Sequence, residues 1–384
     1  MGKVSRICPV CRHHDAEPVY ENTMAPLGGF DMSYRVGRCR QCGFFFADTL
    51  ADEQTFRSYY QSVSKYDVAD EISLLDSLRI DAAVQLCKGI ISYHARVVDL
   101  GCGYGALLSR LKAAGWSDLY GIDPAPNFIE RARRLFGLEH IYCGTMSDAH
   151  RLLPLAQADL VCITAVLEHL PYLRSDLTEL LERLRPGCRI LVEVPALEHF
   201  SGADGEPFGQ FSLEHIQFFS ADSLKNLFGS LGAKCLANAI VNLPVGAADS
   251  LFAIFELTGE VPASFTPSPE TNDVMRSYIN KSQRRLDSVL SRIPKEPLII
   301  YGAGSHTVRL IPHLEKREDL NILAVVDNNP NLLHKTIGKW TIQSPAVIAS
   351  MPDAHIVISS FRYQNDIALS LRGSYPNPLV LCYD

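Results

Sequence analysis

The sequence predicts an α/β protein in which two Rossmann-like domains follow a small cysteine-bearing module. Two stretches, 97–108 and 298–304, each combine an apolar, β-branched run with closely spaced glycines, a pattern typical of a strand that turns tightly into a helix. A third observation is a pair of Cys-x-x-Cys motifs near the N-terminus. The chain has 384 residues, more than one domain usually holds, so we expect three units: residues 1–66, 67–258 and 259–384.

Composition restricts the class of partner. The chain carries 36 Lys and Arg against 43 Asp and Glu, a formal charge of −7, without a strong run of either sign, and this argues against a nucleic-acid partner. No apolar run approaches the length of about 18 residues that a membrane span needs, and the first residues lack the apolar core of a signal peptide. We therefore expect a cytoplasmic protein whose eleven cysteines are thiols or metal ligands.

The N-terminal module carries its chemistry on four cysteines. Cys8 and Cys11 form one Cys-x-x-Cys motif, and Cys39 and Cys42 form the second. Each motif places two sulfurs on a tight turn, and together they complete a tetrahedral site of four thiolates, which predicts a structural Zn²⁺. The spacer is long enough for an inserted hairpin. A redox role would need a thioredoxin-like context, which is absent.

An aromatic stretch, 55–66, links this module to the next. Its tyrosines either belong to the core or line a pocket that the N-terminal module covers; as candidate substrate contacts they are Tyr59, Tyr60 and Tyr66. A helix with apolar periodicity over 70–91 then leads into the first glycine-rich strand.

The stretch 97–105 organises the central unit. Asp99 ends the predicted strand, and Gly101, Gly103 and Gly105 follow it, which lets the backbone approach a ligand closely. The glycine spacing also fits a loose dinucleotide fingerprint. However, a carboxylate at Asp99 would repel a pyrophosphate, whereas it suits the cationic amino group of S-adenosylmethionine.

A second acid supports this assignment. Asp123 ends the next predicted strand, about 20 residues after the first glycine, the offset at which an acid reaches ribose hydroxyls. The two acids and the glycines closely resemble motifs I and II of class I methyltransferases. The resemblance implies an S-adenosylmethionine site made by Asp99, Gly101, Cys102, Gly103, Asp123 and Pro124, with Thr145 and Met146 at the adenine after the third strand.

The rest of the central unit supplies two histidines. His169 lies just past the predicted strand 158–163, at the edge where ligands collect in open α/β sheets. Glu214 and His215 lie in a loop that ends at Ser220, the expected N-cap of the next helix. Segments 234–241 and 250–257 fit an antiparallel pair that closes the sheet.

The C-terminal unit repeats the strand–glycine pattern. A linker over 259–270 and a long helix over 272–293 precede the strand 298–301 with Gly302 and Gly304. Asp327 ends a second strand, and 355–359 predicts a third. This unit either binds a nucleotide or only forms a wall of the substrate cleft.

The order of the three units resembles the sugar C-methyltransferases that act on nucleotide-linked keto-deoxysugars. The resemblance covers nearly the whole chain and implies that His215 is a general base, with Glu214 and His169 beside it in the active site. Two positions depart from the family. Ser212 stands where the family has a tyrosine three residues before the histidine, and the C-terminal glycine segment has Ser305 and His306 in place of the usual Gly-Ala-Lys-Gly type.

The expected mechanism is removal of a proton beside a ketone by His215, with a pKa near neutral, followed by attack on the sulfonium methyl. A capping or packing role for His215 stays open. So do methylation of oxygen or nitrogen on another small metabolite, a non-catalytic scaffold that binds S-adenosylmethionine, and a dehydrogenase or epimerase acting through the C-terminal glycines. The sequence does not indicate an oligomeric state.

Overall fold

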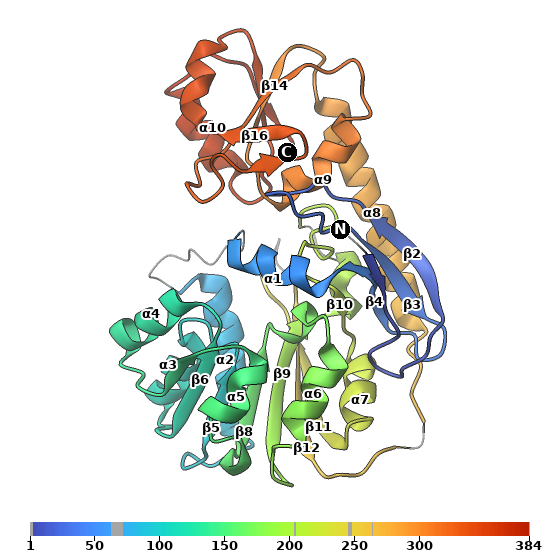
Figure 1. The fold of residues 1–384 in the computed structure, drawn as a ribbon, viewed down its shortest axis with the longest axis vertical. Coiled ribbons are helices and arrows are strands. Elements are labelled where there is room, and N and C mark those ends of the chain that lie inside the picture. Colours follow the sequence, from blue (N-terminus) through green and yellow to red (C-terminus); the bar gives the residue numbers. More distant parts are fainter. Residues whose placement is uncertain (1–2, 63–71, 203–204, 245–247, 263, 384) are drawn as a thin grey trace.

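A computed structural model describes residues 3–62, 72–202, 205–244, 248–262 and 264–383. The described residues build three sheets, one in each unit, with the N-terminal sheet beside the other two (Figure 1). No helix in the described part of the chain is both long and apolar enough to cross a membrane.

The N-terminal sheet has the strand order β1-β4-β3-β2, and all its pairings are antiparallel. The predicted hairpin between the two cysteine motifs is confirmed as β2 paired with β3. A fifth strand, β10, comes from the central unit and pairs with β4. The elements are β1 (Lys3–Ser5), β2 (Ala16–Asn22), β3 (Tyr34–Cys39), β4 (Phe45–Ala51), β10 (Gln217–Phe218) and the following helix α1 (Glu53–Ser62).

The central sheet has seven strands in the order β11-β12-β9-β8-β5-β6-β7. Strands β7, β6, β5, β8 and β9 are parallel, and the predicted closing pair, β11 with β12, is antiparallel. The strands are β5 (Val97–Leu100), β6 (Leu119–Asp123), β7 (Ile141–Cys143), β8 (Leu160–Thr164), β9 (Arg189–Pro195), β11 (Ala233–Val241) and β12 (Ser250–Leu257). The helices are α2 (Leu74–Lys88), α3 (Ala106–Ala114), α4 (Pro126–Phe136), α5 (Ala149–Leu152), α6 (Leu173–Leu181) and α7 (Ala221–Gly229).

The C-terminal sheet has the order β15-β16-β14-β13-β17-β18, in which every pairing except β15 with β16 is parallel. Its first strand, β13, therefore lies between β14 and β17. The strands that follow in the sequence are added first on one side of β13 and then on its other side. The elements are α8 (Glu270–Arg292), β13 (Leu298–Tyr301), α9 (Ser305–Leu314), β14 (Ile322–Val326), β15 (Thr336–Ile337), β16 (Trp340–Gln343), β17 (His355–Ile358), α10 (Gln364–Arg372) and β18 (Leu379–Leu381).

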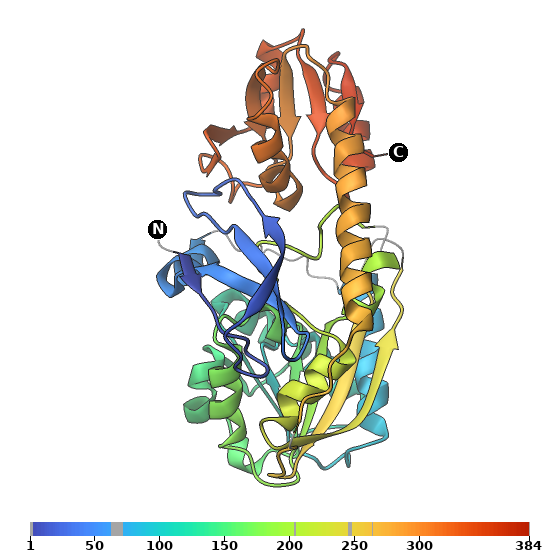
Figure 2. The same cartoon turned by 90° about the vertical axis from the view of Figure 1, so that its right-hand side faces the viewer.

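The described residues 197–202 and 205–218 form a segment that lies where the three units meet. One apolar cluster joins buried side chains of the N-terminal sheet, this segment, α8 and the C-terminal unit; examples are Tyr34, Phe211, Tyr278 and Val308. The long helix α8 runs beside the segment and connects the central and C-terminal units (Figure 2). The loop that carries His215 is thus packed against all three units.

Candidate functional site

The glycine turn after β5 has the backbone that the sequence predicts. Gly101, Gly103 and Gly105 have φ of +75°, +53° and +82°, a region in which other residues are strained. A Cβ on Gly101 would lie 2.5 Å from Val166 Cγ2, whereas a Cβ on Gly103 would meet no atom within 4 Å. At Gly101 the turn therefore packs against Val166, which lies three residues before His169. At Gly103 the space beside the backbone is free of other described atoms.

Asp99 is buried at the end of β5, and one of its carboxylate oxygens has no hydrogen-bond partner in the described part of the chain. It is 1% exposed, and its Oδ1 accepts no hydrogen bond from any described residue. Burial, and then the nearby Asp123 charge, raise the pKa of Asp99 to about 7. A bound cation at this position would supply the missing partner and favour the ionised form.

Asp123 is held in place by backbone groups. Its Oδ2 accepts the N–H of Gly103 and its Oδ1 accepts the N–H of Ala125, each at 2.9 Å. Burial raises the pKa of Asp123, although these two hydrogen bonds oppose the shift. Each carboxylate oxygen keeps a free lone pair, so the acid is fixed where ribose hydroxyls could donate to it. Pro124 follows it and is exposed.

The side chains of three predicted cofactor residues have partners within the chain. Cys102 is 7% exposed and packs in the core beneath the turn, while its N–H donates to the Ile122 carbonyl, so its side chain does not face the cleft. The Thr145 hydroxyl caps a short 3-10 helix through Asp148, and Met146 packs against the cluster under α6. Thr145 is exposed and Met146 is partly buried, so both remain predicted contacts of an adenine.

The two predicted histidines lie together. The rings of His169 and His215 have centroids 4.8 Å apart in an edge-on arrangement. His169 Nδ1 lies 3.2 Å from the Glu214 carbonyl oxygen, so this nitrogen carries a proton and donates it. His169 Nε2 lies 3.9 Å from Oε1 of the buried Glu168.

Burial decides the charge of this cluster. It lowers the pKa of His215 well below the usual value, with further contributions from His169 and Arg79, and it also lowers the pKa of His169. The direction of this shift is away from the near-neutral pKa expected for His215, because neighbouring groups desolvate the partly exposed ring. Burial, with the Glu193 charge, raises the pKa of Glu168 to about 8. His215 is thus a neutral acceptor at physiological pH.

One geometric feature of this cluster also fits a cation. Single ligand atoms of Glu168, His169 and His215 lie within 4.8 Å of one another, and Oε2 of Glu168 has no hydrogen-bond partner in the described residues. Two imidazoles and a carboxylate are a donor set that could hold a divalent metal.

The His215 loop is fixed from two sides. The Ser212 hydroxyl accepts the N–H of His215 at 2.9 Å, and the Ile216 N–H donates to the Glu168 carbonyl at 2.9 Å. The hydroxyl of Tyr34, on β3 of the N-terminal sheet, reaches the carbonyl oxygens of Ser212 and His215 at 3.0 and 2.9 Å. Ser212, which departs from the family pattern, therefore shapes the turn that presents His215.

Comparison with known proteins identifies the central unit. The family described as "Methyltransferase domain" matches residues 74–238, and the family described as "C2185-like, N-terminal" matches residues 295–373. Residues 74–238 form a class I S-adenosylmethionine-dependent methyltransferase domain.

Individual relatives of the methyltransferase domain are partial matches. The chain is 33% identical over 138 residues to a trans-aconitate 2-methyltransferase of Methylobacterium nodulans, covering 35% of this chain and 51% of that protein. It is 26% identical over 126 residues to a mitochondrial ubiquinone biosynthesis O-methyltransferase of Schizosaccharomyces pombe, and this match covers 32% of this chain and 46% of that protein. The chain thus spans about half the length of these curated relatives.

A solved structure resembles part of the chain. It is a Burkholderia thailandensis 1,6-didemethyltoxoflavin-N1-methyltransferase with bound 1,6-didemethyltoxoflavin and S-adenosylhomocysteine, with 18% identity and a TM-score of 0.42. The match covers 63% of this chain and all of that chain.

An ion pair that the sequence did not reveal lies behind the histidines of the methyltransferase domain. Arg79 Nε on α2 donates to Glu193 Oε1 on β9 at 3.0 Å, and its second nitrogen contacts Oε2. Glu193 is 2% exposed and also accepts the Ser250 hydroxyl proton. Glu193 raises the pKa of Arg79, which therefore stays charged and helps keep His215 neutral.

The predicted substrate tyrosines receive little support. Tyr59 is 3% exposed and packs in the shared core edge-on to Phe30, with centroids 6.3 Å apart. The backbone of Tyr60 belongs to α1, and Tyr66 lies outside the described residues. The packing alternative therefore accounts for Tyr59.

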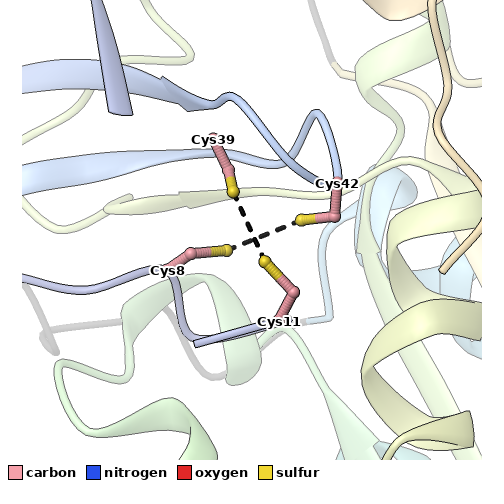
Figure 3. Close-up of side chains that lie close together, drawn as sticks. All are labelled: Cys8, Cys11, Cys39 and Cys42. Carbon is pink, nitrogen blue, oxygen red and sulfur yellow. Dashed lines mark hydrogen bonds between the residues drawn. The ribbon is translucent and has the colours of Figure 1, made fainter. Parts of the chain in front are cut away.

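The four predicted metal ligands converge. Their sulfurs point toward a common centre (Figure 3), with Cys8 Sγ 3.6 Å from Cys42 Sγ and Cys11 Sγ 3.4 Å from Cys39 Sγ. A tetrahedron with Zn–S bonds of about 2.3 Å needs sulfurs a little under 4 Å apart, so the set fits this metal.

Proposed function

We propose that this chain is an S-adenosylmethionine-dependent methyltransferase that methylates a carbon of a nucleotide-linked keto-deoxysugar, with His215 as general base. The observation that carries the proposal is a neutral His215 in a cluster that adjoins the cofactor turn: Val166, three residues before His169, packs directly on Gly101.

The cofactor fits the two acids. Asp99 would receive the cationic amino group and Asp123 the ribose hydroxyls, which matches the unpartnered Oδ1 of Asp99 and the fixed carboxylate of Asp123. When bound, S-adenosylmethionine supplies the methyl group to the acceptor carbon and leaves as S-adenosylhomocysteine.

The histidine cluster would handle the proton. A ketone makes the neighbouring C–H acidic, and the His215 imidazole takes that proton first. The resulting enolate carbon then forms the bond to the methyl group, and the sulfur keeps the electron pair of the broken C–S bond. The Glu214 carbonyl orients the ring of His169, which lies edge-on to His215. The Glu214 side chain remains our candidate for binding a sugar hydroxyl.

The four cysteines would hold a structural Zn²⁺. With four protein ligands no coordination position is left for a substrate, so the ion would fix the two cysteine turns and the β2–β3 hairpin between them.

The decisive experiment screens nucleotide sugars for release of S-adenosylhomocysteine. With the acceptor found, solvent deuterium should exchange into it without cofactor, and His215→Gln should abolish exchange and turnover while leaving cofactor affinity unchanged. His150→Gln, on the exposed face of α5, is the matched control.

Other outcomes identify the alternatives. Turnover of an acceptor that exchanges no deuterium would favour methylation of oxygen or nitrogen. Binding of S-adenosylmethionine without any turnover would favour a scaffold. If a chelator stopped turnover while the cysteine-bound zinc remained, the Glu168–His169–His215 set would act as a metal site instead of a base.

A further inference from the structure

A group of metal-binding side chains lies in the methyltransferase domain, separate from the four cysteines. Single ligand atoms of Glu168, His169 and His215 lie within 4.8 Å of one another, and His169 Nε2 is 3.9 Å from Glu168 Oε1. Imidazole nitrogens favour transition metals such as Zn²⁺ and Co²⁺ over Mg²⁺ and Ca²⁺, and a carboxylate is a common third ligand of Zn²⁺. The donor set therefore indicates a transition metal.

Glu168 provides an independent indication of a ligand. The residue is 2% exposed, and its Oε2 has no hydrogen-bond partner among the described residues. The distance of 3.9 Å from its Oε1 to His169 Nε2 is too long for a hydrogen bond. A buried carboxylate oxygen without a partner is costly, and a cation bound between the carboxylate and the two rings would supply one.

The hydrogen bond made by His169 leaves the appropriate nitrogen for a metal. Its Nδ1 donates to the Glu214 carbonyl oxygen at 3.2 Å, so Nε2 of the neutral ring carries the lone pair. Nε2 is also the nitrogen near Glu168. Metal-binding histidines commonly donate their second nitrogen to a carbonyl in this way, which fixes the ring and raises the basicity of the ligand nitrogen.

Hydrogen bonds join the two segments that carry the three ligands. One segment is a 3-10 turn, Leu167–His169, which follows β8, and the other is the loop before β10. The Ile216 N–H donates to the Glu168 carbonyl, and the Gln217 side chain donates to the Leu170 carbonyl, each at 2.9 Å. The ligands are therefore held near one another by bonds within two residues of each of them.

The charges around the three ligands also suit a cation. Arg79 brings positive charge to Glu168 and His215, but it is paired with Glu193, with 3.0 Å between Arg79 Nε and Glu193 Oε1. The Glu214 carboxylate acts on His169. A divalent ion would thus meet Glu214 and the ionised form of Glu168, and metal binding favours that form.

Binding of a metal requires a small movement of the side chains. Bonds of about 2.1 Å to nitrogen and oxygen place the ligand atoms of a tetrahedral ion about 3.4 Å apart. The three ligand atoms would therefore close by at most about 1.4 Å from their separations of up to 4.8 Å, and both imidazoles are partly exposed and can turn. Three protein ligands leave a fourth position for water.

We infer that Glu168, His169 and His215 form a binding site for a divalent transition-metal ion, and that the bound ion takes the lone pair with which His215 would act as a base. A neutral imidazole has one such nitrogen lone pair, so the ring cannot hold a metal and accept a substrate proton together. The metal site stands on the geometry alone, whereas inhibition by the metal rests on the proposed function.

The test adds Co²⁺ to the full chain after its cysteine site has been loaded with Zn²⁺. We expect calorimetry to show one further equivalent of bound metal. The visible spectrum should be that of Co²⁺ with nitrogen and oxygen ligands, without the sulfur-to-metal charge-transfer bands that the cysteines would give. Mg²⁺ should bind at least about tenfold more weakly than Co²⁺.

Two variants with matched controls assign the ligands. His169→Gln and Glu168→Gln should each weaken Co²⁺ binding at least about tenfold, whereas the exposed positions His150→Gln and Glu179→Gln should leave it within about threefold. Retention of the cysteine-bound zinc and of affinity for S-adenosylmethionine shows that a variant is folded. If the buried Glu168→Gln does not fold, the partly exposed His169→Gln decides the question.

Failure of the two proposals can be separated. Absence of the further equivalent of Co²⁺, or equal Co²⁺ affinity in His169→Gln and the unchanged protein, would overturn the metal site whatever the enzyme methylates. Loss of turnover that follows Co²⁺ occupancy would support both parts of the inference. If binding depends on His169 but turnover is unchanged or increased at saturating Co²⁺, the metal site stands, the inhibition is overturned, and His215 is not the base.

Discussion

Replacing Tyr34 by Phe tests whether the N-terminal module positions the His215 loop. Tyr34 is 2% exposed, and its hydroxyl has one proton to share between the carbonyls of Ser212 and His215. The variant therefore loses one buried hydrogen bond while keeping the ring in the core.

The magnitude follows from that single bond. A net hydrogen bond contributes about 1 kcal/mol, and a buried carbonyl left without a partner costs about 1–3 kcal/mol. We expect local opening of the loop to become easier by about 1–2 kcal/mol, so amide exchange of 212–218 should be about 5–30 times faster. Turnover should fall by a similar factor, because His215 would spend less time in place. Affinity for S-adenosylmethionine should not change, since its cleft is formed by other segments.

Tyr20→Phe is the matched control. Tyr20 stacks on Phe208 in the same cluster, with centroids 4.6 Å apart, but its hydroxyl makes no hydrogen bond in the described part of the chain. Hydrogen exchange measured by mass spectrometry, with calorimetry of the cofactor, separates the two variants. Equal exchange of 212–218 in Tyr34→Phe and the unchanged protein would refute the positioning argument.

Three further predictions concern the cofactor acid, the metal and the buried ion pair. Burial raises the pKa of Asp99 to about 7, and a bound cation prefers the ionised carboxylate, so affinity for S-adenosylmethionine should rise between pH 5.5 and 7 and level off at higher pH. Calorimetry should show that this pH dependence is lost in Asp99→Asn, and a flat profile in the unchanged protein would contradict the prediction. Cys39→Ser should remove one equivalent of zinc by elemental analysis, whereas Cys143→Ser, an exposed thiol outside the cluster, should not. Arg79→Met should lower the free energy of unfolding in urea by about 3 kcal/mol, because it leaves Glu193 buried without its ionic partner; a loss under about 1 kcal/mol would show that Ser250 suffices.

The local signals in the sequence were sufficient for much of the fold and for the cofactor cleft. Glycines that require positive φ, an acid after each of two strands, and paired cysteines are short-range patterns with a direct geometric meaning, and Gly103, Asp123 and Cys8 lie accordingly. The exact ends of elements were less accessible: the helix expected over 70–91 spans Leu74–Lys88, since tertiary packing decides where helices fray.

The supports of the site could not be predicted in the same way. Tyr34 and His215 are 181 positions apart, and Arg79 and Glu193 are 114 apart. No local pattern marks such pairs, because their contact exists only after separate units have packed. For the same reason the sequence did not reveal that the side chain of Cys102, between Gly101 and Gly103, faces the core, where packing holds it.

The role of the N-terminal module follows from its connections. One cysteine turn precedes β2, and the other lies between β3 and β4. Strand β4 pairs with β1, β3 and β10, and β10 begins two residues after His215. The pairing of β10 with β4 therefore ties the end of the His215 loop to the N-terminal sheet, and the Tyr34 hydroxyl on β3 donates to the backbone of that loop. A metal that stiffens the turns of this sheet would act on His215 at a distance, without touching cofactor or acceptor. The cysteine module thus supplies one of the supports that hold the partly exposed ring of His215 in place.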